Sequence, residues 1–179
     1  MTKNQQPVKA ALSPDPAAWI ERFAPDVTPG GRVLDVACGG GRHSRLFASL
    51  GHPVTAIDRD LSKLAAGDNI TTLEVDLEDG SPFPLAGQQF DAVVVTNYLW
   101  RAIFADLITA LKPGGVLIYE TFALGNEKFG KPSNPDFLLA PGELLDVARD
   151  NKLLVLAYEH GEVRDPSPSV RQRIFARKP

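Results

Sequence analysis

The most constraining feature of this chain is the segment Arg32–Ser44, where an apolar run breaks into three consecutive glycines, Gly39–Gly41, before an amphipathic stretch. The apolar run predicts a buried strand, and the stretch after the glycines predicts a helix. Glycines at such a turn let a ligand approach the backbone closely, beside the N-terminus of a helix. A strand, a glycine turn and a helix in this order predict a nucleotide-sized site.

Three acidic residues accompany this turn. Asp35 lies inside the apolar run, where an unpaired carboxylate is costly, so a cationic group of a ligand is its expected partner. Asp58 ends a second apolar run, Pro53–Asp58, about twenty residues further on, where an acid can hold a ribose. Asp76 follows a third run, Thr72–Val75, where an acid can accept a hydrogen bond from the amine of adenine.

Composition and charge narrow the class of protein. The 179 residues, 44% hydrophobic and 23% charged, predict one globular domain at residues 14–179 after a polar, loose tail at residues 1–13. No apolar run approaches the ~20 residues of a membrane span, and the N-terminus lacks the apolar core of a signal peptide. The single cysteine, Cys38, fits a reducing cytoplasm. The net charge of −3 argues against a nucleic-acid partner, although the basic segment Arg164–Pro179 leaves a local anionic partner open.

Strands and helices alternate along the rest of the chain. We predict strands at 33–37, 54–57, 72–75, 92–96, 116–119, 153–158 and 170–176. We predict five helices. The first begins at Asp15–Pro16, and the second begins at Gly41 and buries Leu46, Phe47 and Leu50. The others cover 61–66, the apolar run Ile103, Phe104, Leu107, Ile108 and Leu111, and 142–149. This order predicts a Rossmann-like, doubly wound α/β fold with a seven-stranded, mostly parallel sheet and an antiparallel C-terminal strand. Residues 122–140 form a long loop, predicted as a lid or acceptor-binding segment, with an ordered surface loop as the alternative.

The turn matches a dinucleotide fingerprint incompletely, because Ser44 stands at the third glycine, and an antiparallel last strand is foreign to that fold. The chain from Trp19 onward instead resembles the class I methyltransferases that use S-adenosylmethionine (SAM). The resemblance rests on Val33–Gly41, Ala56–Asp58, Val75–Leu77, Phe90–Asn97 and Leu111–Leu117. The string Ala37–Ser44 is similar to the small bacterial branch labelled tellurite-resistance-like.

The resemblance implies roles for individual residues. The turn Gly39–Gly41, with Gly40 at its centre, would pass under the methionine part of SAM, and Asp58 would hold both ribose hydroxyls. Asp76 and Leu77 would frame the adenine, and Asn97 and Tyr98 would face the methyl group. The further cofactor-binding candidates are Asp35, Arg59 and Ala37, which stands where many members have a glycine. The Asn-Pro-Pro-Tyr motif of many amino and amide methylases is absent from the sequence, which argues against a base- or glutamine-methylating enzyme.

The chemistry depends on the acceptor. A hydroxyl or ammonium acceptor needs a general base, for which the candidates are His43, Tyr98 and Glu120, whereas a sulfur, selenium, tellurium or carboxylate acceptor needs none. His43 equally fits a role in capping or packing at the start of its helix. No cysteine–histidine cluster or carboxylate pair suggests a metal.

Other polar residues have simpler expected roles. We expect Cys38 to fill a small space at the turn, and His52 and His160 to be solvated. On one face of the last strand, we expect the apolar stems of three arginines to lie along the protein with their charged ends in water: Arg171, Arg173 and Arg177. The alternative for these arginines is binding of an anionic substrate.

The sequence therefore favours a cytoplasmic SAM-dependent methyltransferase that transfers a methyl group to a small-molecule acceptor by in-line displacement, with S-adenosylhomocysteine (SAH) as product. The alternatives are a non-catalytic or partner-dependent SAM-binding subunit and, with less support, an NAD(P)-dependent oxidoreductase.

Overall fold

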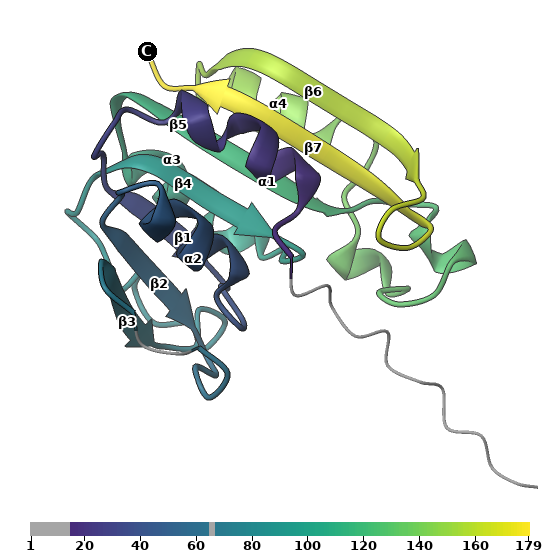
Figure 1. Cartoon of the computed structure of the whole chain (residues 1–179). Helices are drawn as coiled ribbons and strands as arrows, with labels where there is room; N and C mark the ends of the chain where they lie inside the picture. The colour runs from purple at the N-terminus through teal and green to yellow at the C-terminus, as the bar shows by residue number, and fades with distance from the viewer. Residues whose placement is uncertain (1–14, 65–66) are drawn as a thin grey trace, which may run out of the picture.

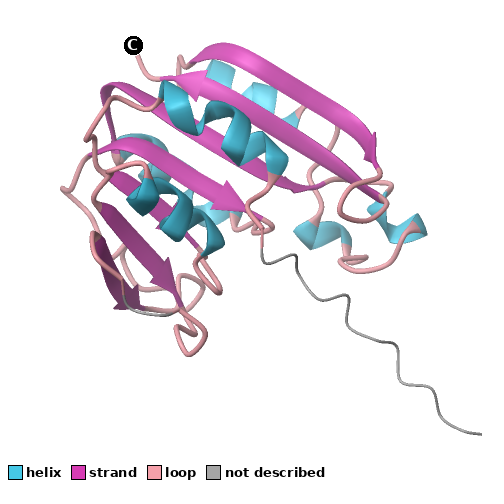
Figure 2. Ribbon diagram, in the orientation of Figure 1, coloured by secondary structure: helices cyan, strands magenta, loops and turns pink. Residues whose placement is uncertain are grey.

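The structure, a computed structural model, describes residues 15–64 and 67–179. It contains a seven-stranded sheet in the order β3-β2-β1-β4-β5-β7-β6, with helices on both faces (Figures 1 and 2). The strands from β3 to β5 in this order are parallel, and β7 runs antiparallel to both β5 and β6. The predicted doubly wound α/β fold with an antiparallel C-terminal strand is confirmed. The predicted tail, residues 1–13, lies outside the described residues.

All seven predicted strands are present, and the differences lie at their ends. The strands are β1 (Val33–Val36), β2 (Val54–Asp58), β3 (Ile70–Glu74), β4 (Phe90–Thr96), β5 (Leu111–Phe122), β6 (Leu154–Val163) and β7 (Ser169–Arg177). The strand predicted to begin at Val116 begins at Leu111, because Leu111 already pairs with Phe90 before a register shift. The strand predicted to end at Tyr158 continues to Val163, because β7 pairs with it as far as Ser169.

Three of the helices are shorter than predicted, whereas the one predicted over 142–149 has the predicted length and is shifted by one residue. The helices are α1 (Ala18–Phe23), α2 (Arg42–Ser49), α3 (Phe104–Thr109) and α4 (Glu143–Asp150), with single 3₁₀ turns at Ala24–Asp26, Arg101–Ile103, Asn126–Lys128 and Pro135–Phe137. No described helix is long and apolar enough to cross a membrane.

Three helix predictions are wrong. α1 does not begin at Asp15–Pro16, because its N-cap is Ala17, whose backbone N–H is bound by a side chain of α2. Leu111 does not extend α3, because it belongs to β5. Residues 61–64 form a turn and no helix, and residues 65–66 lie outside the described part.

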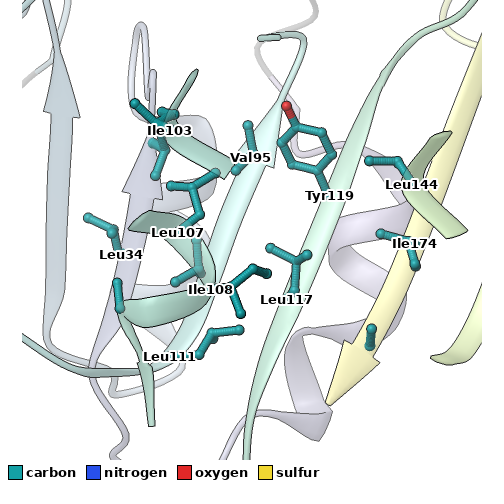
Figure 3. Close-up of a cluster of buried hydrophobic side chains, with 14 of the residues drawn as sticks. Leu34, Val95, Ile103, Leu107, Ile108, Leu111, Leu117, Tyr119, Leu144 and Ile174 are labelled. Carbon is teal, nitrogen blue, oxygen red and sulfur yellow. The ribbon is translucent and has the colours of Figure 1, made fainter. Parts of the chain in front are cut away.

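Two apolar layers enclose the sheet. On one face, α1 and α2 pack through Trp19, Ile20, Phe23 and Phe47. On the other face, α3 and α4 pack through residues that include Leu107, Ile108 and Leu144, against Leu34, Val95 and Tyr119 of the strands (Figure 3). The predicted burial of Leu50 is wrong: it follows the last residue of α2, beyond the buried face of that helix, and 48% of it is exposed.

The topology decides where a ligand can bind. β1 lies between β2 and β4, so the connection after β1 turns to one side of the sheet and the connection after β4 turns to the other. The carboxyl ends of such neighbouring strands border a crevice in doubly wound folds. The predicted glycine turn after β1 and Asn97 after β4 therefore meet at one edge of the sheet.

Candidate cofactor and acceptor site

A cavity of about 980 Å³ opens at this edge. Most of the predicted cofactor-binding residues line it: Asp35, Ala37, Gly39, Gly40, Asp58, Arg59, Asp76, Leu77 and Asn97. Two of the three predicted bases, His43 and Tyr98, line it as well. Gly41 and Glu120 are not among its lining residues. One cavity thus gathers side chains from the ends of β1, β2, β3 and β4.

The glycine turn leaves room beside its backbone. Gly39 has a φ of +54°, and a Cβ atom added there would meet nothing within 4 Å, so the space beside this turn belongs to the cavity. Gly41 has a φ of +73°, and a Cβ atom there would collide with Leu64. Gly41 is therefore explained by backbone conformation and packing, whereas Gly39 and Gly40 border the space that a ligand would take.

Asp58 connects β2 to this turn. Its Oδ2 atom accepts a hydrogen bond of 2.8 Å from the backbone N–H of Gly39, and its Oδ1 atom accepts one of 3.0 Å from that of Asp60. A carboxylate has about four lone-pair sites, so these two contacts leave acceptor capacity for hydroxyl groups in the cavity. Asp58 is thus held in place by the loop that would carry the ligand.

The end of β3 supplies a polar and an apolar part. The Asp76 Oδ1 atom accepts a 2.9 Å hydrogen bond from the backbone N–H of Glu78, which fixes the carboxylate at the cavity wall. Val75, Leu77 and Leu99 are apolar residues that line the same cavity. Apolar side chains together with the carboxylate of Asp76 in one cavity suit a flat heteroaromatic ring that carries an amine.

Asp35 is a buried carboxylate at the floor of the cavity. It is 1% exposed, and the Ser44 hydroxyl donates a 2.6 Å hydrogen bond to it. Burial raises the pKa of Asp35 from its ordinary 3.8 to about 6, although the hydrogen bonds from Ser44 and the charge of Arg42 oppose this shift. A cationic ligand group beside Asp35 would offset the cost of the buried charge.

We expect Asp35→Asn to stabilise the ligand-free protein at about pH 8 by roughly 2–3 kcal/mol and to change its stability little at about pH 4. Because the pKa of Asp35 is raised in the folded state, its protonated form favours folding below about pH 4. This contribution is lost as the pH rises through about 6, because Asp35 then becomes a buried carboxylate anion. The amide of the variant stays neutral at every pH and buries no charge. Thermal unfolding across this pH range measures the effect. A gain that is the same at both pH values would contradict it.

His43 packs at the start of two helices. Its Nε2 atom accepts a 3.1 Å hydrogen bond from the backbone N–H of Ala17, the N-cap of α1. Burial and the charge of Arg42 lower the pKa of His43 to about 3, so the ring is neutral near pH 7. A neutral ring that accepts at Nε2 carries its proton on Nδ1, so neither nitrogen has a lone pair available for a base. Of the two predicted alternatives, capping and packing fits the geometry.

Tyr98 lines the cavity but is held as a phenol. Burial, together with the charge of Glu78 and a hydrogen bond to it, raises the pKa of Tyr98 well above its ordinary value. Its backbone carbonyl accepts a 2.8 Å hydrogen bond from the Tyr119 hydroxyl on β5. Tyr98 is therefore fixed at the cavity wall as a hydroxyl group.

Glu120 belongs to a buried ion-pair network behind the cavity. Its Oε1 atom lies 3.1 Å from Arg171 Nη1, and its Oε2 atom lies 2.8 Å from Arg173 Nε, a close ion pair whose orientation is not that of a hydrogen bond. Arg173 also contacts Glu159 at 3.3 Å. The expectation that these arginine stems snorkel is wrong for Arg171, which is 6% exposed, because β7 lies inside the sheet between β5 and β6. Arg177 is exposed, which is consistent with the expectation for that residue.

Other polar residues were predicted with mixed success. His52 is buried, because its Nδ1 atom lies 2.9 Å from the Gly31 carbonyl oxygen, so the prediction of a solvated turn residue is wrong. His160 is exposed, as predicted. Burial raises the pKa of Cys38 to about 12, which keeps it a thiol and fits a filler.

Several residues of the cavity wall were not among the site residues predicted from the sequence. Thr96 and Thr121 lie next to predicted positions, and the hydroxyl of Thr96 is buried with no hydrogen-bond partner in the described part of the chain. Phe122 is the last residue of β5, and Pro132 and Phe137 come from the long loop that follows it. The sequence predicted residues 122–140 as a lid or acceptor-binding segment, but which of them line the cavity depends on the path of the loop.

The loop is tied down at its far end. Arg101 donates hydrogen bonds of 2.8 and 2.9 Å to the carbonyl oxygens of Asp136 and Leu138, and it pairs with Glu143 at 2.6 Å. Asn126 is buried and bridges the loop to β7, because its Oδ1 atom accepts from the Val170 N–H at 3.2 Å. These contacts hold Phe137 and Pro132 against the cavity.

Comparison with known proteins agrees with this geometry. Residues 33–115 match the family model described as "Methyltransferase domain". This segment of the chain therefore resembles a methyltransferase domain. The matched part runs from β1 to the first residues of β5, so it covers the glycine turn and the acids that line the cavity.

Individual proteins show the same likeness. The chain is 41% identical over 104 residues to a ubiquinone biosynthesis O-methyltransferase from Xanthomonas campestris pv. campestris, an alignment that covers 52% of this chain and 44% of that protein. The chain thus spans about half the length of the curated relatives it matches. TehB from Haemophilus influenzae superposes with a TM-score of 0.69 at 21% identity, over 89% of this chain and 61% of that one.

A third comparison concerns a protein with ligands bound. The 1,6-didemethyltoxoflavin-N1-methyltransferase of Burkholderia thailandensis, crystallised with 1,6-didemethyltoxoflavin and S-adenosylhomocysteine, superposes with a TM-score of 0.60 at 16% identity, over 90% of this chain and 78% of that one. The two structural likenesses show that the chain has the Rossmann-like fold of these methyltransferases. The resemblance inferred from the sequence is confirmed at this level.

Proposed function

We propose that this protein is a SAM-dependent methyltransferase that acts on a small-molecule acceptor in the cytoplasm. The observation that carries the proposal is that the carboxylates of Asp35, Asp58 and Asp76 border one cavity, around a glycine turn that Asp58 itself holds. The methyltransferase domain and the named relatives support the same reaction.

The residues present fit SAM. Asp58 retains acceptor capacity for two ribose hydroxyls, and Asp76 with Leu77 suits the adenine amine and ring. The open space beside Gly39 accommodates the methionine part, and buried Asp35 offers a partner for its ammonium group. When bound, SAM would supply an electrophilic methyl group on a cationic sulfur.

The task of the protein is then alignment. Holding the acceptor in line with the methyl group at near-contact distance supplies several kcal/mol through positioning alone. We propose that the loop 122–140 forms the acceptor wall, because Phe122, Pro132 and Phe137 line the cavity and Arg101 fixes the loop behind them. Asn97 and Tyr98 directly follow β4 and line the same cavity.

Calorimetric titration of the full chain with SAM, SAH and NADH tests the proposal. We expect binding of SAM and SAH in the micromolar range, about −8 kcal/mol, and no heat with NADH. Binding of NADH alone would replace the proposal with the oxidoreductase reading. Binding of SAM without SAH formation against a broad panel of acceptors, restored by a second protein, would favour a partner-dependent subunit.

A further inference from the structure

A buried arginine decides which way the Asn97 amide faces. Arg171 Nη1 donates a 2.6 Å hydrogen bond to Asn97 Oδ1, across 74 residues of sequence. The same guanidinium is held by Glu120 at 3.1 Å, by the Ser169 hydroxyl at 3.0 Å and by the ring of Phe122, whose centroid lies 4.2 Å away. With four partners, the guanidinium group of Arg171 is a rigid support for Asn97.

This contact has a consequence for the cavity. A guanidinium has five N–H donors and no acceptor, so the amide oxygen of Asn97 must face Arg171. The amide group that remains for a ligand is the Nδ2 amine, which carries two donors and forms no hydrogen bond within residues 15–64 and 67–179. Asn97 lines the cavity, so the end of β4 offers a ligand hydrogen-bond donors and no amide acceptor.

None of the three residues predicted as general bases is placed to remove a proton from the acceptor. The Nε2 lone pair of His43 is taken by the N–H of Ala17, and both oxygens of Glu120 contact guanidinium groups. Burial and the charge of Glu78 raise the pKa of Tyr98, so its hydroxyl stays protonated near pH 7. A neutral hydroxyl needs a base to remove its proton, and an ammonium group needs one to expose its lone pair. An acceptor that is already an anion before it binds needs no general base, because it has a lone pair available and no proton to lose.

We propose that the acceptor is a small carboxylic acid, whose carboxylate Asn97 recognises through its Nδ2 donors, with Arg171 as the positioning residue that turns the amide. A carboxylate is ionised near pH 7 and forms strong, charge-assisted hydrogen bonds with N–H donors. The inference rests on the proposed function. In the reaction, a carboxylate oxygen forms the bond to the methyl carbon with its own electron pair while the methyl–sulfur bond breaks and its electron pair stays on sulfur. The products are a methyl ester and SAH, and no proton is released.

Benzoate and benzylamine are matched probes, since both carry the aromatic ring that Phe122 and Phe137 would receive. The full chain is first titrated with SAH and then, saturated with SAH, with each probe. We expect benzoate to bind at least about tenfold more tightly than benzylamine. Failure to bind SAH would overturn the proposed function. Binding of SAH with benzylamine equal to or tighter than benzoate, or with no benzoate binding, would overturn this inference alone.

Variants test the roles of the two residues. Asn97→Asp keeps an oxygen for Arg171 but replaces the donors with a second carboxylate oxygen, so it should weaken benzoate binding at least about tenfold and improve benzylamine binding. Arg171→Met should reduce the ratio of benzoate to benzylamine affinity, and Arg171→Lys should restore part of it. Arg177→Met removes an exposed arginine of the same strand and is the matched control, expected to leave the ratio unchanged.

The ratio of the two affinities separates positioning from general damage. A variant that only loosens the fold weakens both probes and SAH together, whereas loss of the Asn97 donors changes the ratio. Benzoate affinity that is unchanged in Asn97→Asp would overturn the assignment of Asn97, even if Arg171→Met fails to fold.

Discussion

Replacement of Glu120 by glutamine is expected to lower the free energy of unfolding by about 3 kcal/mol. The carboxylate is 4% exposed and lies between Arg171 and Arg173, both of which lose their central counter-charge when it is neutralised. Breaking a buried ion pair leaves a charge in a poorly solvated place, which costs more than the pair itself contributes. Urea unfolding of the ligand-free variant measures the loss.

Glu159→Gln is the control for this change. Glu159 also contacts Arg173, at 3.3 Å, but half of its side chain is exposed, so we expect its loss to cost at most about 1 kcal/mol. The comparison also separates two roles of Glu120, which the sequence alone suggested as a general base. A variant with unchanged stability and abolished methyl transfer would show that the catalytic role is correct and the structural one is wrong.

Asp58→Ala is expected to weaken SAM binding at least about tenfold, and up to about a thousandfold, because each hydrogen bond to a charged group contributes about 1.5–3 kcal/mol. Two ribose hydroxyls would lose their acceptor, and the N–H of Gly39 would lose the contact that holds the glycine turn. Calorimetric titration with SAM measures the affinity.

Asp60→Ala tests whether the effect is specific. Asp60 lies in the same turn and accepts a 3.0 Å hydrogen bond from the N–H of Ser62, but it is not among the residues that line the cavity. We expect its SAM affinity to stay within about twofold of the unsubstituted chain. Equal affinity in Asp58→Ala and the unsubstituted chain would remove Asp58 from the cofactor site.

The order of the elements and most of the cofactor wall could be predicted from local pattern. Runs such as Ala92–Val95 are apolar throughout because both faces of a central parallel strand are covered, and Gly39 and Gly41 mark backbone with positive φ. Acids at strand ends, such as Asp58, point to the same edge because parallel strands end together. These signals are local, so they can be recognised in the sequence without knowledge of the fold.

The ends of elements and the partners of polar side chains could not be predicted in this way. α1 begins where His43, from another helix, binds the Ala17 N–H, and β6 extends as far as β7 pairs with it. His52 looks like a residue of an exposed turn, yet the carbonyl of Gly31 gives it a buried partner. In each case the decisive contact joins segments that are distant in the sequence.

The acceptor side shows the same division most clearly. Periodicity and glycine placement in the sequence specified a doubly wound sheet and a nucleotide-sized site, because they report which backbone conformations and faces each segment can adopt. Only the tertiary structure placed Arg171 against Asn97 and Glu120, across 74 and 51 residues. The reason is that β7 inserts between β5 and β6, and the burial and hydrogen bonding of a side chain depend on which strands become neighbours.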